Sequence, residues 1–298
     1  MDRRETLVTA GEELVPLPEK RWLNMARAHE AAVGPWIDAY RDRRASRQKH
    51  PVHDFLFEYY QVKRHVLRRW RPTVDQVLQG EAARSFLEDD RYRETTDGVR
   101  LDRSRLDEST RAMMEWTCQL IRRAQSRPPR FNCFGLHEWA MVYKAEDVRH
   151  RQVPLRLSQS EVNAVVEGSS IRCTHFDAFR FFTAPAAPRN EFQPTREDRL
   201  EMEQFGCIHF NMDLYRWSAK LCPWLGSDLI RDSFLLAMRA REVDMRASPY
   251  ELSDYGYEPI LIETVEGRDQ YKKEQEAIYE CGQRLAQRFL QLCDRVLA

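Results

Sequence analysis

The stretch EQFGCIHFNMDLYRWSAKLCPWL, residues 203–225, is the segment around which the rest of this chain is organised. As a helix it would place His209 and Asp213 on one face, about one turn apart, because they are spaced i,i+4. Apolar residues cover most of the remaining surface: Phe205, Ile208, Met212, Leu214, Trp217 and Leu221. A charged pair inside such a helix costs several kcal/mol unless it is paired or ligated. The segment therefore predicts a buried helix that carries functional polar groups.

Helical periodicity along the chain predicts a mainly α fold. With 298 residues, 42% hydrophobic and 11% aromatic, the chain can bury a sizeable core and is not disordered. Helical periodicity extends over residues 18–47, 51–70, 106–123, 228–245 and 267–297. Residues 131–144 fit either a helix or a strand. No Gly/Ser-rich linker divides the chain, so we expect a flexible N-terminal tail at 1–17 and a single helical domain at 18–298.

Local signals add a few short strands and several helix starts. Residues 91–102 predict a hairpin around Asp97-Gly98, and residues 169–175 and 255–264 read as further short strands. Ser158 and Glu161 match a capping box, and Thr195 and Ser227 are candidate N-caps for the segments that follow them. We therefore expect a minor β component in an otherwise helical fold.

The charge balance, the N-terminal sequence and the cysteines indicate where in the cell the protein is located and which partners it binds. The 47 Lys and Arg residues balance 47 Asp and Glu residues, so there is no long-range attraction towards nucleic acid or an anionic membrane. The N-terminal sequence has no apolar signal region, and no segment is apolar enough to span a bilayer. The seven cysteines lack metal-ribbon spacing and fit reduced thiols. We expect a cytoplasmic protein without a membrane partner.

Histidine and carboxylate residues recur together in aromatic surroundings. The pairs are His53 with Glu58, His137 with Glu138, His175 with Asp177, and His209 with Asp213. If the four segments converge, such nitrogen and oxygen donors suit iron, zinc or manganese, with His137, His175, Asp177 and His209 as the candidate ligands. The ExxH pairs of ferritin-like proteins and the HExxH motif are absent. For any one pair, a buried histidine that is hydrogen-bonded to a carboxylate in the core is the simpler interpretation.

A basic and aromatic stretch at 59–71 is a candidate nucleic-acid surface. It offers Lys63, Arg64, Arg68 and Arg69 for phosphates, interleaved with aromatic rings for stacking. The alternative, a solvated helix face paired with nearby acids, is favoured for a charged stretch of this kind. DNA is thus one possible partner, and a small-molecule substrate is the other.

Long motifs in the last two-thirds or so of the chain resemble a known family. They are LHEWAMVYKAEDVRHRQVPLRLSQSEVNAVVE (136–167), IRCTHFDAFRFFTAPAAPRNEFQPTRED (171–198), EQFGCIHFNMDLYRWSAKLCP (203–223) and REVDMRASPYELSDYGYEPILIET (241–264). They resemble a bacterial family, frequent in actinobacteria, whose members are usually labelled 3-methyladenine DNA glycosylase. The resemblance implies hydrolytic release of an alkylated purine base that is flipped into an aromatic pocket.

The same resemblance implies roles for particular residues. A carboxylate such as Asp213 or Glu138 would activate water or stabilise the cationic transition state, with His209 as a further catalytic candidate. An aromatic side chain would stack on the base, and the candidates are Trp139, Phe181, Tyr215 and Trp217.

Three hypotheses follow from the sequence. The first is the glycosylase, which predicts that Asp213→Asn abolishes base release from alkylated DNA. The second is a metal-dependent enzyme acting on a small molecule, which predicts bound metal that falls on His175→Ala or His209→Ala. The third is a non-enzymatic helical binding protein, in which His209→Leu with Asp213→Leu keeps or raises stability.

Overall fold

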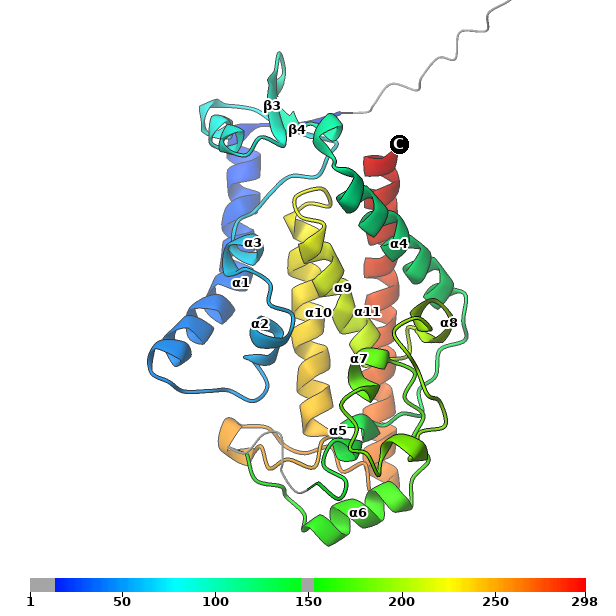
Figure 1. The fold of residues 1–298 in the computed structure, drawn as a ribbon. Coiled ribbons are helices and arrows are strands. Elements are labelled where there is room, and N and C mark those ends of the chain that lie inside the picture. Colours follow the sequence, from blue (N-terminus) through cyan, green and yellow to red (C-terminus); the bar gives the residue numbers. More distant parts are fainter. Residues whose placement is uncertain (1–13, 146–152) are drawn as a thin grey trace, which may run out of the picture.

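Helix α9 (Ile208–Lys220) lies at the centre of the molecule. The computed structural model describes residues 14–145 and 153–298. α9 packs against α10 (Ser227–Arg246) and α11 (Val265–Leu297), and these three helices form the body of the fold (Figure 1). Gly282 of α11 sits so close to α9 that a Cβ there would lie 1.6 Å from Asn211 Oδ1. The predicted buried helix is therefore present, shorter than the 203–225 segment.

Two apolar clusters enclose α9 from opposite sides. One contains Ile208, Met212 and Tyr215 of α9, together with residues of α1 (Glu19–Ala45) and α10. The other contains the alternate face of α9, including Phe210 and Leu214, together with residues of α4 (Glu108–Gln125) and α11. Because these two faces of α9 are apolar and covered, a polar side chain buried on it must find a partner inside the protein.

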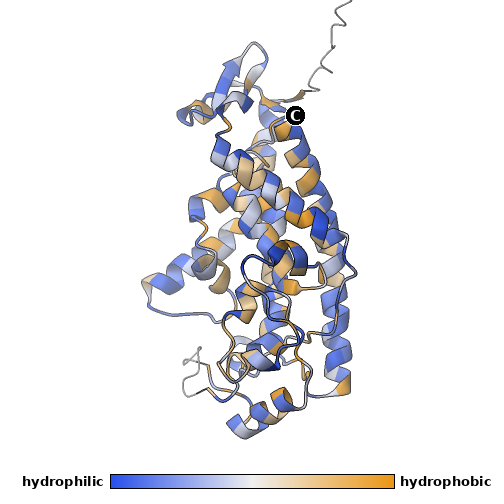
Figure 2. Cartoon of the chain, turned by 45° about the vertical axis from the view of Figure 1, so that its right-hand side comes forward, coloured by the Kyte–Doolittle hydropathy of each residue, from blue (hydrophilic) through white to orange (hydrophobic). Residues whose placement is uncertain are grey.

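The C-terminal helix α11 is amphipathic, as its sequence pattern predicts. Its buried residues recur every three or four positions, and Thr264 caps its first turn by accepting a hydrogen bond from the Gly267 backbone N–H. Hydrophilic and hydrophobic residues alternate along the long helices in Figure 2. None of the helices in the described parts of the chain is long and apolar enough to cross a membrane.

A small sheet lies at one end of the helices. Its strands are β1 (Val15–Leu17), β2 (Gln76–Leu78), β3 (Tyr92–Thr95) and β4 (Gly98–Leu101), in the order β1-β2-β4-β3. β3 and β4 form the predicted hairpin, whereas β1 pairs in parallel with β2. The expected tail at 1–17 therefore ends in a paired strand, and residues 1–13 lie outside the described residues.

Two strand predictions are wrong. Residues 169–175 contain only an isolated bridge from Ile171 to Asn190, and residues 255–264 form a short 3-10 turn and extended chain without a strand partner. Both segments lie beside the body of the fold, where side chains and helix ends satisfy their backbone groups; for example, the Ile260 N–H donates to the Arg246 carbonyl. Their β-rich composition reflects burial rather than sheet pairing.

The helix predicted at 51–70 is broken in two. α2 (Phe55–Tyr59) and α3 (Arg64–Arg68) are separated at Gln61, whose φ of 52° lies in the left-handed region and cannot continue a helix. Further short helices lie between α4 and α9 in the chain. They are α5 (Leu136–Ala140), α6 (Gln159–Glu167), α7 (Phe176–Phe179) and α8 (Arg199–Met202). The remaining 3-10 helices are Glu81–Glu88, Arg103–Arg105, Ala187–Arg189 and Ser253–Tyr255.

The three cap predictions have different outcomes. Ser158 and Glu161 form the capping box of α6. Thr195 does not start α9: its hydroxyl bonds to Asp198 in the turn before α8, and Cys207 precedes α9. Ser227 is the first residue of α10 rather than its cap, and its hydroxyl donates to the Arg69 carbonyl.

Candidate functional site

A cavity of about 370 Å³ opens between α2, α5, α7, α9 and α10. One part of its wall is aromatic, formed by Phe55, Tyr59, Tyr60 and Phe181. The other part is polar, formed by Glu138, His175, Asp177, His209 and Arg241 among others. Ligand sites in proteins are commonly concave, mainly apolar and supplied with a few convergent polar groups. The composition of this wall fits that description.

Two histidines and one carboxylate meet beside the cavity, and of these three residues His209 lines it. His137 is on α5, His209 on α9 and Asp244 on α10, and one donor atom from each lies within 4.8 Å of the others. His137 Nε2 is 2.7 Å from Asp244 Oδ1, and His209 Nε2 is 3.6 Å from Asp244 Oδ2. Metal bonds of about 2.0–2.2 Å place neighbouring donor atoms about 3 Å apart, so these separations suit a metal ion. We call these three residues the triad.

Two donor atoms of the triad are buried without a well-formed hydrogen bond. His137 Nε2 and Asp244 Oδ1 have no hydrogen bond of acceptable geometry in the described structure, although they lie close together. Burial, and next the charge of His137, hold the pKa of His209 well below the usual range, so this imidazole is neutral and able to act as a ligand. Burial alone would raise the pKa of Asp244, but electrostatic interactions with the neighbouring imidazoles, His137 first, and with Arg241 outweigh burial and lower this pKa.

Arg241 holds the two acids beside the triad. Its Nη1 donates to Glu138 Oε1 and to Asp244 Oδ2, each at 2.7 Å. The guanidinium also lies over the Phe55 ring, 4.1 Å from its centroid. Arg241 is 1% exposed, so this ion pair is shielded from water. The arrangement leaves one cation for two carboxylates in the immediate surroundings of the triad.

A second cluster, His175, Asp177 and Asp213, lies on the other side of His209. Donor atoms of these three residues also lie within 4.8 Å of one another, and the His175 and His209 rings stack with centroids 5.5 Å apart. His175 Nδ1 lies 2.8 Å from Glu203 Oε2, which leaves Nε2 as the ring nitrogen available to a ligand. Burial alone would lower the pKa of His175, but the Glu203 charge outweighs it and raises this pKa.

Arginines compensate the acids of this second cluster. Arg199 donates to Asp213 Oδ2 at 2.9 Å and lies 3.4 Å from Glu203, while Arg216 and Arg180 each lie 3.0 Å from Asp177. Three acids thus face three guanidinium groups. Burial still raises the pKa of Asp213, and its Oδ1 has no hydrogen-bond partner of acceptable geometry in the described structure.

The charge balance distinguishes the two clusters. Around the triad, Glu138 and Asp244 outnumber Arg241, so a cation would complete the charge balance there. In the second cluster the arginines already neutralise the carboxylates, and a cation would have to displace one of them. The triad is therefore the better metal site, and His175 with Glu203 is better suited to proton transfer.

The structure brings most of the candidate ligands together but regroups them. His137 and His209 belong to the triad, whereas His175, Asp177 and Asp213 belong to the second cluster. The i,i+4 pair on α9 is thus divided between the two clusters. The His53 imidazole lies apart from both and is 2.6 Å from the Tyr257 hydroxyl.

Three of the four aromatic stacking candidates lie in the core. Trp139, Tyr215 and Trp217 are buried and do not line the cavity, and Trp139 Nε1 donates to the Ala247 carbonyl. Phe181 does line the cavity. Stacking on a ligand in this cavity is therefore available to Phe181 and to the α2 rings, and not to the other three candidates.

Four residues of the site were not among the sequence candidates. They are Glu203, Arg199, Arg241 and Asp244. Arg241 and Asp244 share one face of α10 at i,i+3 spacing, which is a weak signal because surface helices carry many such pairs. Only their burial distinguishes them from ordinary surface charges, and burial depends on how α10 packs.

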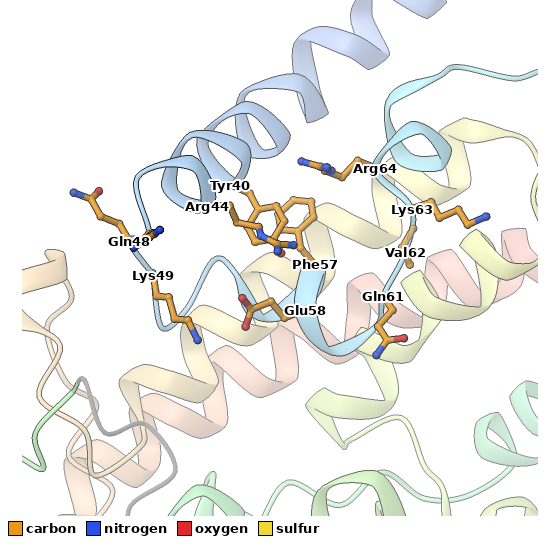
Figure 3. Close-up of a pocket in the computed structure, with 11 residues that line it drawn as sticks. Tyr40, Arg44, Gln48, Lys49, Phe57, Glu58, Gln61, Val62, Lys63 and Arg64 are labelled. Atoms are coloured by element: carbon orange, nitrogen blue, oxygen red, sulfur yellow. The ribbon is translucent and has the colours of Figure 1, made fainter.

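A wider basic groove adjoins the cavity. It has a volume of about 630 Å³ and shares Lys49 and Glu58 with the cavity wall (Figure 3). Lys63 and Arg64 of the predicted nucleic-acid stretch line this groove. Arg68 and Arg69 do not: Arg68 is paired with Glu30 and Asp38, and Arg69 donates to the Ser85 carbonyl.

Comparisons of this chain with protein-family models, with curated proteins and with solved structures found no match. We therefore infer the function from the geometry of the site.

Proposed function

We propose that this protein is a metal-dependent enzyme that acts on a small molecule in the aromatic cavity. The observation that carries this proposal is the triad: His137, His209 and Asp244 come from three separate helices and leave donor atoms facing one another, with His137 and Asp244 buried and His209 partly exposed to the cavity. Two imidazoles and one carboxylate suit iron, zinc or manganese and leave coordination positions open for water or substrate. His209 lines the cavity, so an open position would face the substrate.

The cavity also supplies a group for proton transfer. His175 lines the wall next to His209, and Glu203 orients its ring by bonding Nδ1. A histidine held in this way can give or take a proton through Nε2 at a reacting group beside the metal. A bound metal would supply Lewis acidity or an activated water molecule.

The metal content of untagged protein, purified without chelators, tests this proposal. We expect about one equivalent of iron, zinc or manganese per chain, and a large loss of it in His137→Ala and in His209→Ala. His175→Ala should retain the metal, because His175 is outside the triad. His65→Ala, on the exposed surface of α3, is the matched control. Folded protein that binds none of these metals, even on titration, would rule the proposal out.

A second candidate is the glycosylase activity implied by the family resemblance. One observation favours it: Phe55 and Tyr59, whose stacked rings have centroids 4.9 Å apart, line the same cavity as the carboxylates of Glu138 and Asp177. Glu138 lines this cavity whereas Asp213 does not, so Glu138 is the better candidate for activating water. Release of base from alkylated DNA by the wild type, abolished in Glu138→Gln, would support this activity; no release would exclude it.

A further inference from the structure

The basic groove beside the cavity carries cations without acidic partners. Five cationic residues line it: Arg44, Arg47, Lys49, Lys63 and Arg64. In the part of the chain that the structure describes, none of the five makes an ion pair, and Glu58 is the one acid among the lining residues. A chain with no net charge thus concentrates positive charge at one place.

Segments from both sides build the groove. Figure 3 shows Lys49 on one side and Lys63 and Arg64 on the other, with the rings of Tyr40 and Phe57 between them. Those rings stack with centroids 4.6 Å apart and form an apolar floor. The lining cations are solvent-exposed and the floor is buried, which gives a groove with an apolar base and charged rims.

The cations just outside the groove are neutralised. Arg41 pairs with Asp38 and Asp42, Arg43 pairs with Asp54, and Arg68 pairs with Glu30 and Asp38. A nucleic-acid strand needs a continuous path of unpaired cations along its backbone. The positive charge here ends at the edges of the groove, so it fits a compact anion better than a polymer.

We propose that the groove binds the phosphate group of a small substrate whose reacting part lies in the adjoining cavity. The two hollows share Lys49 and Glu58, so one molecule can occupy both. Their volumes, about 630 and 370 Å³, fall in the range of small-molecule sites. The aromatic wall takes the apolar or planar part of the molecule, and the unpaired cations take its phosphate. The placement of the reacting part rests on the proposed enzymatic function, whereas phosphate binding does not.

Calorimetric titration of the full-length protein with inorganic pyrophosphate at low ionic strength tests this. We expect saturable binding that weakens with salt, and an affinity at least about tenfold lower in the double variant Lys63→Gln/Arg64→Gln. The matched control is Arg41→Gln/Arg84→Gln, which removes two exposed arginines that have carboxylate partners outside the groove. The assignment would be overturned if pyrophosphate bound the groove variant as tightly as the wild type. It would equally be overturned if the measured heat came from removal of a bound metal by pyrophosphate, because that heat would persist in the groove variant.

Two further outcomes separate this inference from the proposed function and from nucleic acid. The His209→Ala variant should lose metal and still bind pyrophosphate. Wild-type protein that binds metal but no pyrophosphate in the groove would defeat only this inference. Wild-type protein that binds pyrophosphate in the groove but no metal would defeat only the enzyme proposal. A single-stranded oligonucleotide that binds more than about a hundredfold tighter than pyrophosphate, and loses this affinity in the groove variant, would replace the small substrate with nucleic acid.

Discussion

Arg241 Nη1 and Asp244 Oδ2 lie 2.7 Å apart on one face of α10, and both side chains are almost completely buried. The same guanidinium nitrogen is 2.7 Å from Glu138 Oε1, so a single cation stabilises two buried acids. This links the metal-binding proposal to the stability of the fold, since the loss of any member leaves charge unpaired in the interior.

Removal of that cation should destabilise the protein strongly. Arg241→Met leaves Glu138 and Asp244 without their shared partner, and we expect the free energy of unfolding to fall by about 3–5 kcal/mol. Urea denaturation followed by circular dichroism measures this. Arg239→Met is the control, because Arg239 pairs with Glu274 at the surface and should cost less than about 1 kcal/mol. Equal effects of the two variants would show that the buried ion pair contributes little.

Metal binding should stabilise the native state. A metal present at a hundred times its dissociation constant adds about 2.7 kcal/mol to the free energy of unfolding when it binds only the folded chain. We expect this gain, measured by thermal or urea unfolding with and without metal, in the wild type and in His175→Ala. It should be absent in His209→Ala. The same gain in His209→Ala would place the metal away from the triad.

The close contact between α9 and α11 should not tolerate a side chain at Gly282. A Cβ there would meet Asn211 Oδ1 at 1.6 Å, and the Asn211 amide is held by hydrogen bonds to the Phe205 and Cys207 carbonyls. We expect Gly282→Ala to lower the free energy of unfolding by about 3 kcal/mol and to reduce metal affinity by shifting α9. Gly168→Ala, with an ordinary φ and only one neighbouring atom, at 3.2 Å, should change stability far less.

Stability should depend on the protonation of His50 at mildly acid pH. Burial, and next the charge of His53, lower the pKa of His50 to about 4. The unfolded chain binds this proton near pH 6.5 and the folded chain does not, so stability present above pH 6.5 is lost as the pH falls towards 4. We expect the free energy of unfolding to fall by about 1 kcal/mol over this range, after allowance for solvent screening of the partly exposed ring.

Comparison with His50→Asn isolates this contribution. His50 Nδ1 accepts hydrogen bonds from the Val52 and His53 backbone N–H groups, and an asparagine oxygen can replace it. The difference in urea midpoint between pH 7 and pH 5 should be smaller in the variant than in the wild type. An unchanged difference would mean that other groups control acid stability.

Local patterns determined the elements that depend on neighbouring residues. Helix α9, the α6 capping box, the β3–β4 hairpin and the amphipathic α11 follow from spacing, caps and turn residues within each segment. The same reasoning failed at Gln61, where one left-handed residue breaks the predicted 51–70 helix, and at the two apolar segments that are buried without pairing as strands. Those outcomes depend on contacts with distant parts of the chain.

Sequence patterns predicted a mainly helical protein and several of the histidines and carboxylates that gather near its centre, but not Asp244 or Glu203. Helix packing sets which of them meet: His209 faces His137 and Asp244, while its helical neighbour Asp213 faces Arg199 and His175. The reason is physical. Spacing along a helix sets the direction of a side chain, but its partner comes from another helix, and the packing of α5, α8 and α10 around α9 brings that partner into place.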